Sequence, residues 1–80
     1  MNKYIATFFN HYNALVFFNY ISRIEPANLM PTPRKVSSSC GTCVSFETDK
    51  VHTFLHNAEW EIEAIYKETQ DGFLRVLAKA

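Results

Sequence analysis

The pattern of apolar and polar positions predicts alternating strands and helices along the 80-residue chain. Tyr4–Phe9 is rich in aromatic and β-branched residues, which favours a strand. Ala14–Arg23 carries apolar residues at positions 14, 17, 18 and 21, which is the spacing of one helix face. Leu15 and Val16 widen this apolar face, so we expect a deeply packed helix.

Capping and blocking residues set the limits of this first helix. Asn10 or Asn13 can cap its amino end, and Pro26 prevents the helix from continuing further along the chain. Ala27–Met30 is then predicted as a short second strand. Pro31 ends that strand because proline cannot donate a hydrogen bond to a strand ladder.

The pattern repeats in the second half of the chain. Thr42–Phe46 is predicted to begin a third strand. Thr48 or Asp49 then caps a short second helix with apolar residues at 51, 54 and 55, and Asn57 ends it.

The last third of the chain predicts a hairpin. Trp60–Lys67 alternates apolar and charged residues, which is typical of a strand with one solvated face. Asp71-Gly72 is a hairpin turn signal, and Phe73–Leu77 returns either as a C-terminal edge strand or as a short helix.

This order of elements predicts an α+β fold of the ferredoxin-like split βαβ type (βαββαβ), an antiparallel sheet with two helices on one face. Right-handed crossovers would bring several turns to one end of the sheet. These are the turn at Asn10 and His11, the loop after the second strand, and the turn near His56 and Asn57. The amino end of the first helix, which favours anions, would lie there too.

Composition indicates one folded domain over residues 1–80, because 48% of the residues are hydrophobic and 15% are aromatic. Eight basic residues balance eight acidic ones, so no positive field exists to attract nucleic acid. No apolar stretch is long enough to span a membrane. Two cysteines without a preceding signal peptide predict a reduced, cytoplasmic protein.

Aromatic residues outnumber what one small helix-facing core needs. We therefore expect Tyr4, Phe9, Tyr12 or Phe73 to be exposed on the sheet face that the helices leave open. Such a patch would suggest a homodimer or a docking partner.

The central stretch Leu29–Phe46 carries the most distinctive chemistry, including both cysteines in the sequence C-G-T-C. Cys40 follows three serines and precedes Gly41, which permits the backbone to turn sharply and expose the sulfur. Arg34 and Lys35 precede it and would lower its pKa if the loop folds back. Thiolates in such loops attack disulfides, carry sulfane sulfur or bind soft metals.

Cys43 is the second candidate thiol, either as a resolving cysteine or as a second carrier. Residues three apart on a strand point to opposite faces, so Cys40 and Cys43 can pair only if the two residues between them form a turn. Zinc would need both cysteines and two of His11, His52 and His56. We favour solvated histidines and expect no metal and no other cofactor.

Acidic residues in the predicted fourth strand are a weaker candidate for chemistry. Glu59, Glu61 and Glu63 could form a catalytic carboxylate pair. No pocket is indicated for them, and we expect them to line the solvated face of the strand.

The central motif resembles one known family. Met30-Pro31-x-Pro33-Arg34, followed by Ser37-Ser38-Ser39-Cys40-Gly41, is similar to the motif of small bacterial domains described as Putative Se/S carrier protein-like. Further similarities lie at Thr7-Phe8, Ala14-Leu15, Phe46 and Ile65-Tyr66. The resemblance covers residues 4–68, and residues 69–80 look like an extension.

The resemblance implies that Cys40 holds sulfur or selenium as a persulfide or selenopersulfide. The partners would be a donor enzyme such as a cysteine desulfurase and an acceptor protein, and the chain would be a carrier rather than an enzyme. Arg34 would supply a cation. Donors to the terminal sulfur would come from Ser37, Ser38, Ser39 and Gly41. Two alternatives stay open: a thiol–disulfide redox protein using Cys40 and Cys43, and an interaction module.

Overall fold

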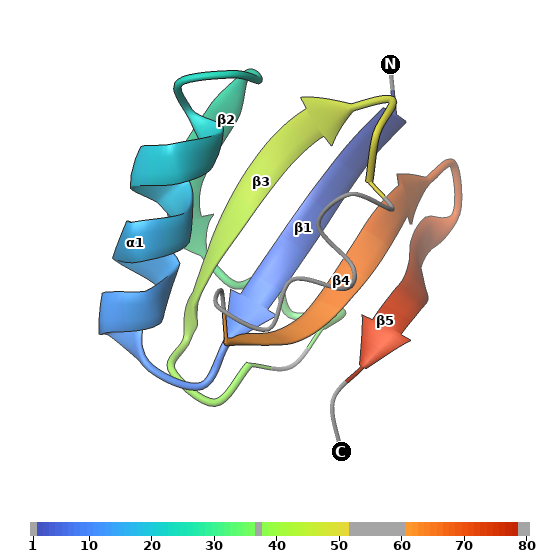
Figure 1. The fold of residues 1–80 in the computed structure, drawn as a ribbon. Coiled ribbons are helices and arrows are strands. Elements are labelled where there is room, and N and C mark those ends of the chain that lie inside the picture. The colour runs from blue at the N-terminus through green and yellow to red at the C-terminus, as the bar shows by residue number, and fades with distance from the viewer. Residues whose placement is uncertain (1, 37, 52–60, 79–80) are drawn as a thin grey trace.

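The computed structural model describes residues 2–36, 38–51 and 61–78. Within these residues the chain forms five strands and one helix (Figure 1). In chain order they are β1 (Asn2–Phe8), α1 (His11–Ile21), β2 (Ala27–Pro31), β3 (Thr42–Thr48), β4 (Ile62–Thr69) and β5 (Gly72–Ala78).

The five strands form one sheet in the order β2-β3-β1-β4-β5. Every neighbouring pair is antiparallel, and β1 lies in the centre between β3 and β4. β1 and β2 therefore run in the same direction with β3 between them, and α1 makes the connection. The β4–β5 hairpin places the end of the described chain at one edge, as the turn signal at Asp71-Gly72 predicted.

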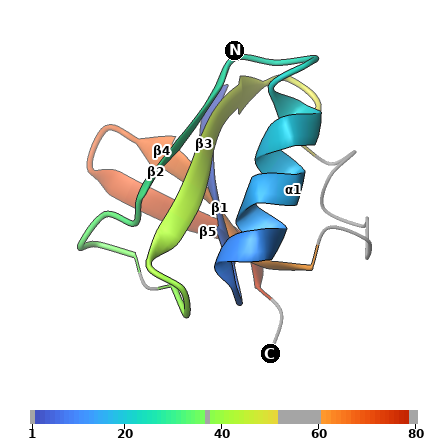
Figure 2. The same ribbon diagram turned by 90° about the vertical axis from the view of Figure 1, so that its left-hand side faces the viewer.

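One face of the sheet packs against α1 (Figure 2). Phe17 of α1 lies at the centre of this core, with its ring centroid 5.5 Å from that of Phe8 and 5.6 Å from that of Phe46. Ala14 and Ile21, one turn to either side of Phe17, are also buried. Phe17→Ala would remove all of these contacts, at a cost of about 3–5 kcal/mol in the free energy of unfolding.

The predicted amino-terminal cap of α1 is confirmed, but the predicted deep packing of this helix is not. The Asn10 side chain accepts a hydrogen bond from the Asn13 backbone N–H at 2.9 Å, so the helix begins at His11. Leu15 and Val16 are 37% and 36% exposed. The expected widening of the buried stripe is therefore wrong, because α1 contacts the sheet along one side.

The predicted ferredoxin-like fold with two helices is wrong. The described residues form a five-stranded antiparallel sheet with one helix, and β5 is a full strand of that sheet. Thr48, expected to cap a second helix, instead ends β3, where it pairs with Asn2 and its hydroxyl accepts the Lys50 N–H. Most of the predicted second helix falls in residues 52–60, which lie outside the described residues.

The aromatic residues expected on the open face lie in three different places. Tyr4 is buried in the core beneath α1, where it stacks on Phe46. Phe9 follows the end of β1 and Tyr12 lies on α1, and both are exposed. Phe73 on β5 is half-buried. These four residues therefore do not form one apolar patch on the open face of the sheet. Dimerisation stays a prediction.

Across the described ranges, no helix is both long enough and apolar enough to cross a membrane.

Candidate functional site

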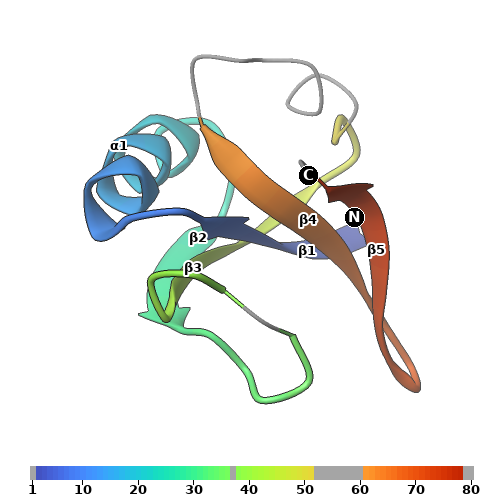
Figure 3. The same ribbon diagram turned by 90° about the horizontal axis from the view of Figure 1, so that it is seen from below.

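The cysteine loop, residues 32–41, connects β2 to β3 and lies on the sheet face opposite α1 (Figure 3). Its two ends are tied together, because the Thr32 N–H donates to the Gly41 carbonyl at 2.9 Å. Farther along the loop, the end of the Lys35 side chain lies 3.9 Å from the position that a Cβ would occupy on Gly72. The loop therefore reaches from β2 across to the β4–β5 hairpin.

The Cys40 thiol is half-buried near the point where β3 begins. Its side chain packs against the edge of the core beneath α1. Its Sγ lies 3.4 Å from the Thr42 carbonyl oxygen, to which the thiol donates, and 3.8 Å from the Ser38 hydroxyl oxygen. Both of these partners, a backbone carbonyl and a serine hydroxyl, are uncharged.

The Ser38 hydroxyl lies between two acceptors. Its Oγ is 3.5 Å from the Phe8 carbonyl oxygen and 3.8 Å from the Cys40 Sγ. A serine hydroxyl has one proton, so it can donate to only one of these atoms at a time. It can donate to Phe8 while Cys40 is a thiol and turn to the sulfur when the sulfur carries a negative charge.

Ser39 donates its hydrogen bonds to Glu63 and not to the Cys40 sulfur. Its backbone N–H donates to Glu63 Oε1 at 3.1 Å, and its hydroxyl donates to Glu63 Oε2 at 2.5 Å. Ser39 was predicted to donate to a terminal sulfur, but in this arrangement Glu63 of β4 holds both of its donors. Ser37 lies outside the described residues.

Gly41 has the positive φ that the sequence predicted for a sharp turn, at +74°. A Cβ added to Gly41 would meet nothing within 4 Å, so the requirement for glycine is conformational rather than steric. The turn lets the chain pass from Cys40 directly into β3.

The amino end of α1 is held beside the start of β3. His11 Nδ1 and Thr42 Oγ1 lie 3.3 Å apart within hydrogen-bonding distance. The predicted gathering of the Asn10–His11 turn and the cysteine loop at one end of the sheet is confirmed by this contact. His56 and Asn57, predicted at the same end, lie outside the described residues.

Cys43 occupies a very different environment from Cys40. It is fully buried on β3, opposite Thr7 and Met30, and its thiol donates to the Pro31 carbonyl at 3.8 Å. Burial raises the pKa of the Cys43 thiol from 9.0 to about 11. The nearby Thr32 hydroxyl offsets part of this rise in pKa, although it has no hydrogen-bond partner of good geometry, and charge on Cys40 adds to the rise.

The predicted cations do not contact the thiol. Arg34 and Lys35 are exposed, and no contact in the described part of the chain joins either of them to Cys40. For metals, the described ranges contain no group of three or more potential histidine, cysteine or carboxylate ligands. His52, needed for the proposed zinc set, lies outside those ranges.

Sequence reasoning missed the residues that hold the loop in place. Glu63 was assigned to the solvated face of a strand, and the Thr42 and Phe8 carbonyls carry no side-chain signal at all. A register irregularity in the β1–β4 ladder between Thr7 and Phe8 accompanies the start of β4, and no residue pattern indicated it. The contact between the Glu63 carboxylate and Ser39 became apparent only from the three-dimensional structure.

Comparison with known proteins gives one positive result. Neither the curated proteins nor the solved structures contain a match to this chain. The model of the family described as Putative Se/S carrier protein-like matches residues 3–67, from β1 to near the end of β4. This match covers most of the chain and confirms the resemblance of the central motif, and the chain belongs to the Putative Se/S carrier protein-like family.

Proposed function

We propose that this protein carries sulfur or selenium on Cys40, as a persulfide or selenopersulfide, between a donor enzyme and an acceptor protein. Membership of the family supports a carrier role. The observation that carries the proposal is the contrast between the two thiols. Cys40 is half-exposed in a loop at the end of the sheet, whereas Cys43 is fully buried.

Besides the donor persulfide and the acceptor thiol, the transfer requires only one accessible thiol on this protein. It needs no oxidant and no reductant. The Cys40 thiolate attacks the outer sulfur of a persulfide on the donor enzyme. A new S–S bond to Cys40 forms as the S–S bond in the donor breaks, and the donor cysteine leaves as a thiolate. The thiol proton of Cys40 passes to solvent, and no net oxidation occurs. Attack by an acceptor thiolate on the outer sulfur then repeats the exchange.

The cysteine loop contributes a hydrogen-bond donor, the Ser38 hydroxyl, that can reorient when the Cys40 sulfur becomes negatively charged. Once Cys40 loses its proton, its sulfur can no longer donate a hydrogen bond to the Thr42 carbonyl. The carbonyl oxygen then lies close to a negatively charged sulfur. The Ser38 hydroxyl can then turn from Phe8 to Cys40 and stabilise that charge. Hydrogen bonds to charged groups are worth about 1.5–3 kcal/mol.

Cys43 is poorly suited to act as a partner in a dithiol switch. Its sulfur is buried, and its raised pKa leaves few thiolates at neutral pH. Both cysteines are free thiols in the structure. These features favour a one-cysteine carrier over a redox pair.

The test is sulfur loading of the reduced protein. The protein is incubated anaerobically with a cysteine desulfurase and cysteine, and its intact mass is then measured without reductant. We expect an adduct of one sulfur atom that reductant removes, absent in Cys40→Ser and retained in the matched Cys43→Ala variant. The same assay with a selenocysteine lyase and selenocysteine asks whether selenium is accepted. Equal loading of wild type and Cys40→Ser would contradict the proposal.

A further inference from the structure

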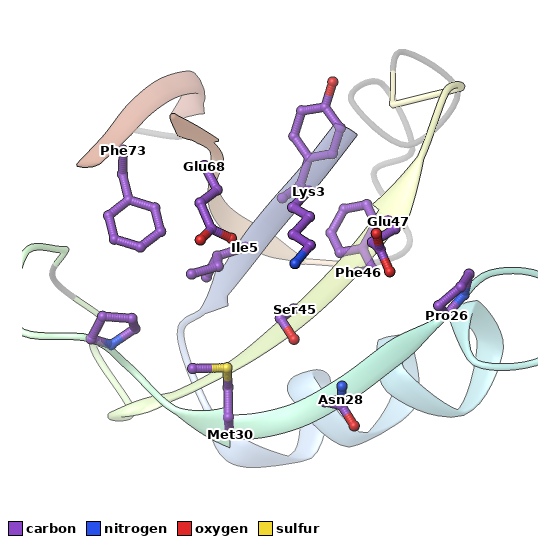
Figure 4. Close-up of a pocket in the computed structure, with 12 residues that line it drawn as sticks. Lys3, Ile5, Pro26, Asn28, Met30, Ser45, Phe46, Glu47, Glu68 and Phe73 are labelled. Atoms are coloured by element: carbon purple, nitrogen blue, oxygen red, sulfur yellow. The ribbon is translucent and has the colours of Figure 1, made fainter. Parts of the chain in front are cut away.

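The sheet face opposite α1 holds a hollow of about 260 Å³ (Figure 4). Ile5 of β1 and Ser45 of β3 line its floor, and Ile5 is only 4% exposed although it lies on the open face. Met30 of β2 and Phe73 of β5 stand on opposite sides. Pro33 of the cysteine loop also lines the hollow. The hollow is therefore a concave site with apolar walls.

Three charged side chains project into this hollow. Lys3 on β1 lies directly opposite Glu47 on β3. The register that sets Tyr4 opposite Lys67 places Glu68 of β4 on the other side of Lys3. Figure 4 shows Lys3 between the two carboxylates, with its amino group over the floor.

The three charges do not neutralise one another. Within the residues that the structure describes, the side chains of Lys3, Glu47 and Glu68 form no ion pair and no hydrogen bond. Opposite charges on neighbouring strands usually pair across the ladder. Here they surround an open space instead, which leaves both signs of charge available to a ligand.

We propose that the hollow binds a free α-amino acid with an unbranched apolar side chain, in its zwitterionic form. Lys3 pairs with the carboxylate of the ligand. The ammonium group, which has three donors, pairs with Glu68, one of the two carboxylates that flank Lys3. The side chain lies between Met30 and Phe73, where a flexible thioether chain is well accommodated.

Charge and size exclude other classes of small molecule. Phosphates and dicarboxylates would meet two carboxylates for every lysine. An uncharged apolar ligand would cover three charged groups without pairing them, which is unfavourable. A volume of about 260 Å³ is below the range of drug-sized ligands, so the occupant is small.

The hollow is separate from the contacts of the Cys40 thiol. Pro33 belongs to the cysteine loop, and Met30 lies opposite Cys43. Ser38 and Thr42, which contact the Cys40 sulfur, do not line the hollow. Amino-acid binding in the hollow can therefore be tested independently of the sulfur-carrier proposal.

The test is a titration of the reduced, ¹⁵N-labelled protein with L-methionine, followed by NMR. We expect saturating shifts at the amides of Met30, Ser45 and Phe73, with a Kd of about 1 mM. Two analogues of methionine test the zwitterion, one without the carboxylate and one without the ammonium. Each should bind about tenfold more weakly, because each leaves one sign of charge unpaired. Absence of saturating shifts, or equal binding of either analogue, would overturn the proposal.

Charge-neutralising variants locate the site. Lys3→Met and Glu68→Gln should each weaken methionine binding about tenfold. The matched controls Lys50→Met and Glu25→Gln remove the same charges outside the hollow and should leave binding unchanged. Cys40→Ser should also bind as wild type does. Equal losses in the variants and their controls would show a nonspecific charge effect and overturn the proposal.

Discussion

Cys40 and Cys43 are three residues apart, but they occupy opposite kinds of environment. Cys40 lies half-exposed in a loop, with a serine hydroxyl and a carbonyl as its neighbours. Cys43 is fully buried in β3, and its pKa is raised to about 11. The two-residue spacing alone suggests a pair of equivalent thiols, whereas the fold separates them into an accessible thiol and a core residue.

The difference follows from where the turn ends and the strand begins. Gly41, at a φ of +74°, ends the loop, and Thr42 already pairs with Pro31 in the β2–β3 ladder. Cys43 is therefore a strand residue held on both sides by β1 and β2. A thiol in that position packs in the interior of the sheet, whereas Cys40, the residue before the glycine, stays partly accessible.

The largest predicted effect is in the rates of alkylation. At about pH 8, a thiol with a pKa near 11 is a thiolate in roughly one molecule in a thousand, and Cys43 is also shielded from reagent. We expect iodoacetamide to modify Cys40 at least about 100-fold faster than Cys43, as measured by mass spectrometry of the fragmented protein. In denaturant the two rates should converge. Equal rates in the native protein would contradict the difference in accessibility between the two thiols.

A second prediction concerns stability at high pH. The pKa of Cys43 is raised on folding, so the native state retains the thiol proton at a pH where the unfolded chain has lost it. Its stabilising contribution is therefore fully present below pH 9.0 and is lost as pH rises through about 11.

Urea unfolding of wild type and Cys43→Ala at several pH values measures this loss. The free energy of unfolding of wild type, relative to that of the variant, should decrease by roughly 2–3 kcal/mol as pH rises from 9.0 to about 11. A difference between the two proteins that stays constant with pH would show that Cys43 titrates as it does in the unfolded chain.

Ser38→Ala should slow the alkylation of Cys40 by about tenfold, because the thiolate loses its hydroxyl donor. Ser22→Ala, which removes an exposed hydroxyl at the end of α1, is the matched control and should leave the rate unchanged. The measurement is the rate of iodoacetamide modification across a range of pH. An unchanged rate in Ser38→Ala would show that this hydroxyl stays on the Phe8 carbonyl.

The smallest predicted effect is an increase in reactivity. Glu63 places a negative charge beside the loop and occupies both donors of Ser39. Glu63→Ala should therefore raise the alkylation rate of Cys40 about threefold, by removing the charge and freeing the donors. Glu68→Gln on the same strand is the control and should show the wild-type rate. A slower reaction in Glu63→Ala would mean that Glu63 positions Cys40 for attack.

The sequence predicted local features of the fold better than their assembly. The Asn10 cap, the Asp71-Gly72 turn and the approximate strand positions follow from residue types with strong local preferences. The second helix was inferred from a few apolar positions, and that short pattern could not reveal that β3 continues to Thr48. Strand extension depends on pairing with Asn2, which is distant in sequence.

The candidate site was located from the sequence, but its contacts were not. A motif with three serines, a cysteine and a glycine identified the loop, and the positive φ of Gly41 was predicted correctly. The roles expected for Arg34 and Ser39 assumed that neighbours in sequence are neighbours in space. The structure instead joins Ser39 to Glu63, 24 residues away, through contacts that no local pattern encodes.

Localisation of the sulfur adduct on wild-type protein, after loading by a desulfurase, tests most directly whether Cys40 is the carrier residue. Fragmentation between the two cysteines in the mass spectrometer assigns the adduct to one residue. We predict one additional sulfur on Cys40, with Cys43 still a free thiol, and loss of that sulfur to an added acceptor thiol. An adduct on Cys43, or a disulfide joining Cys40 to Cys43 in place of an adduct, would contradict it.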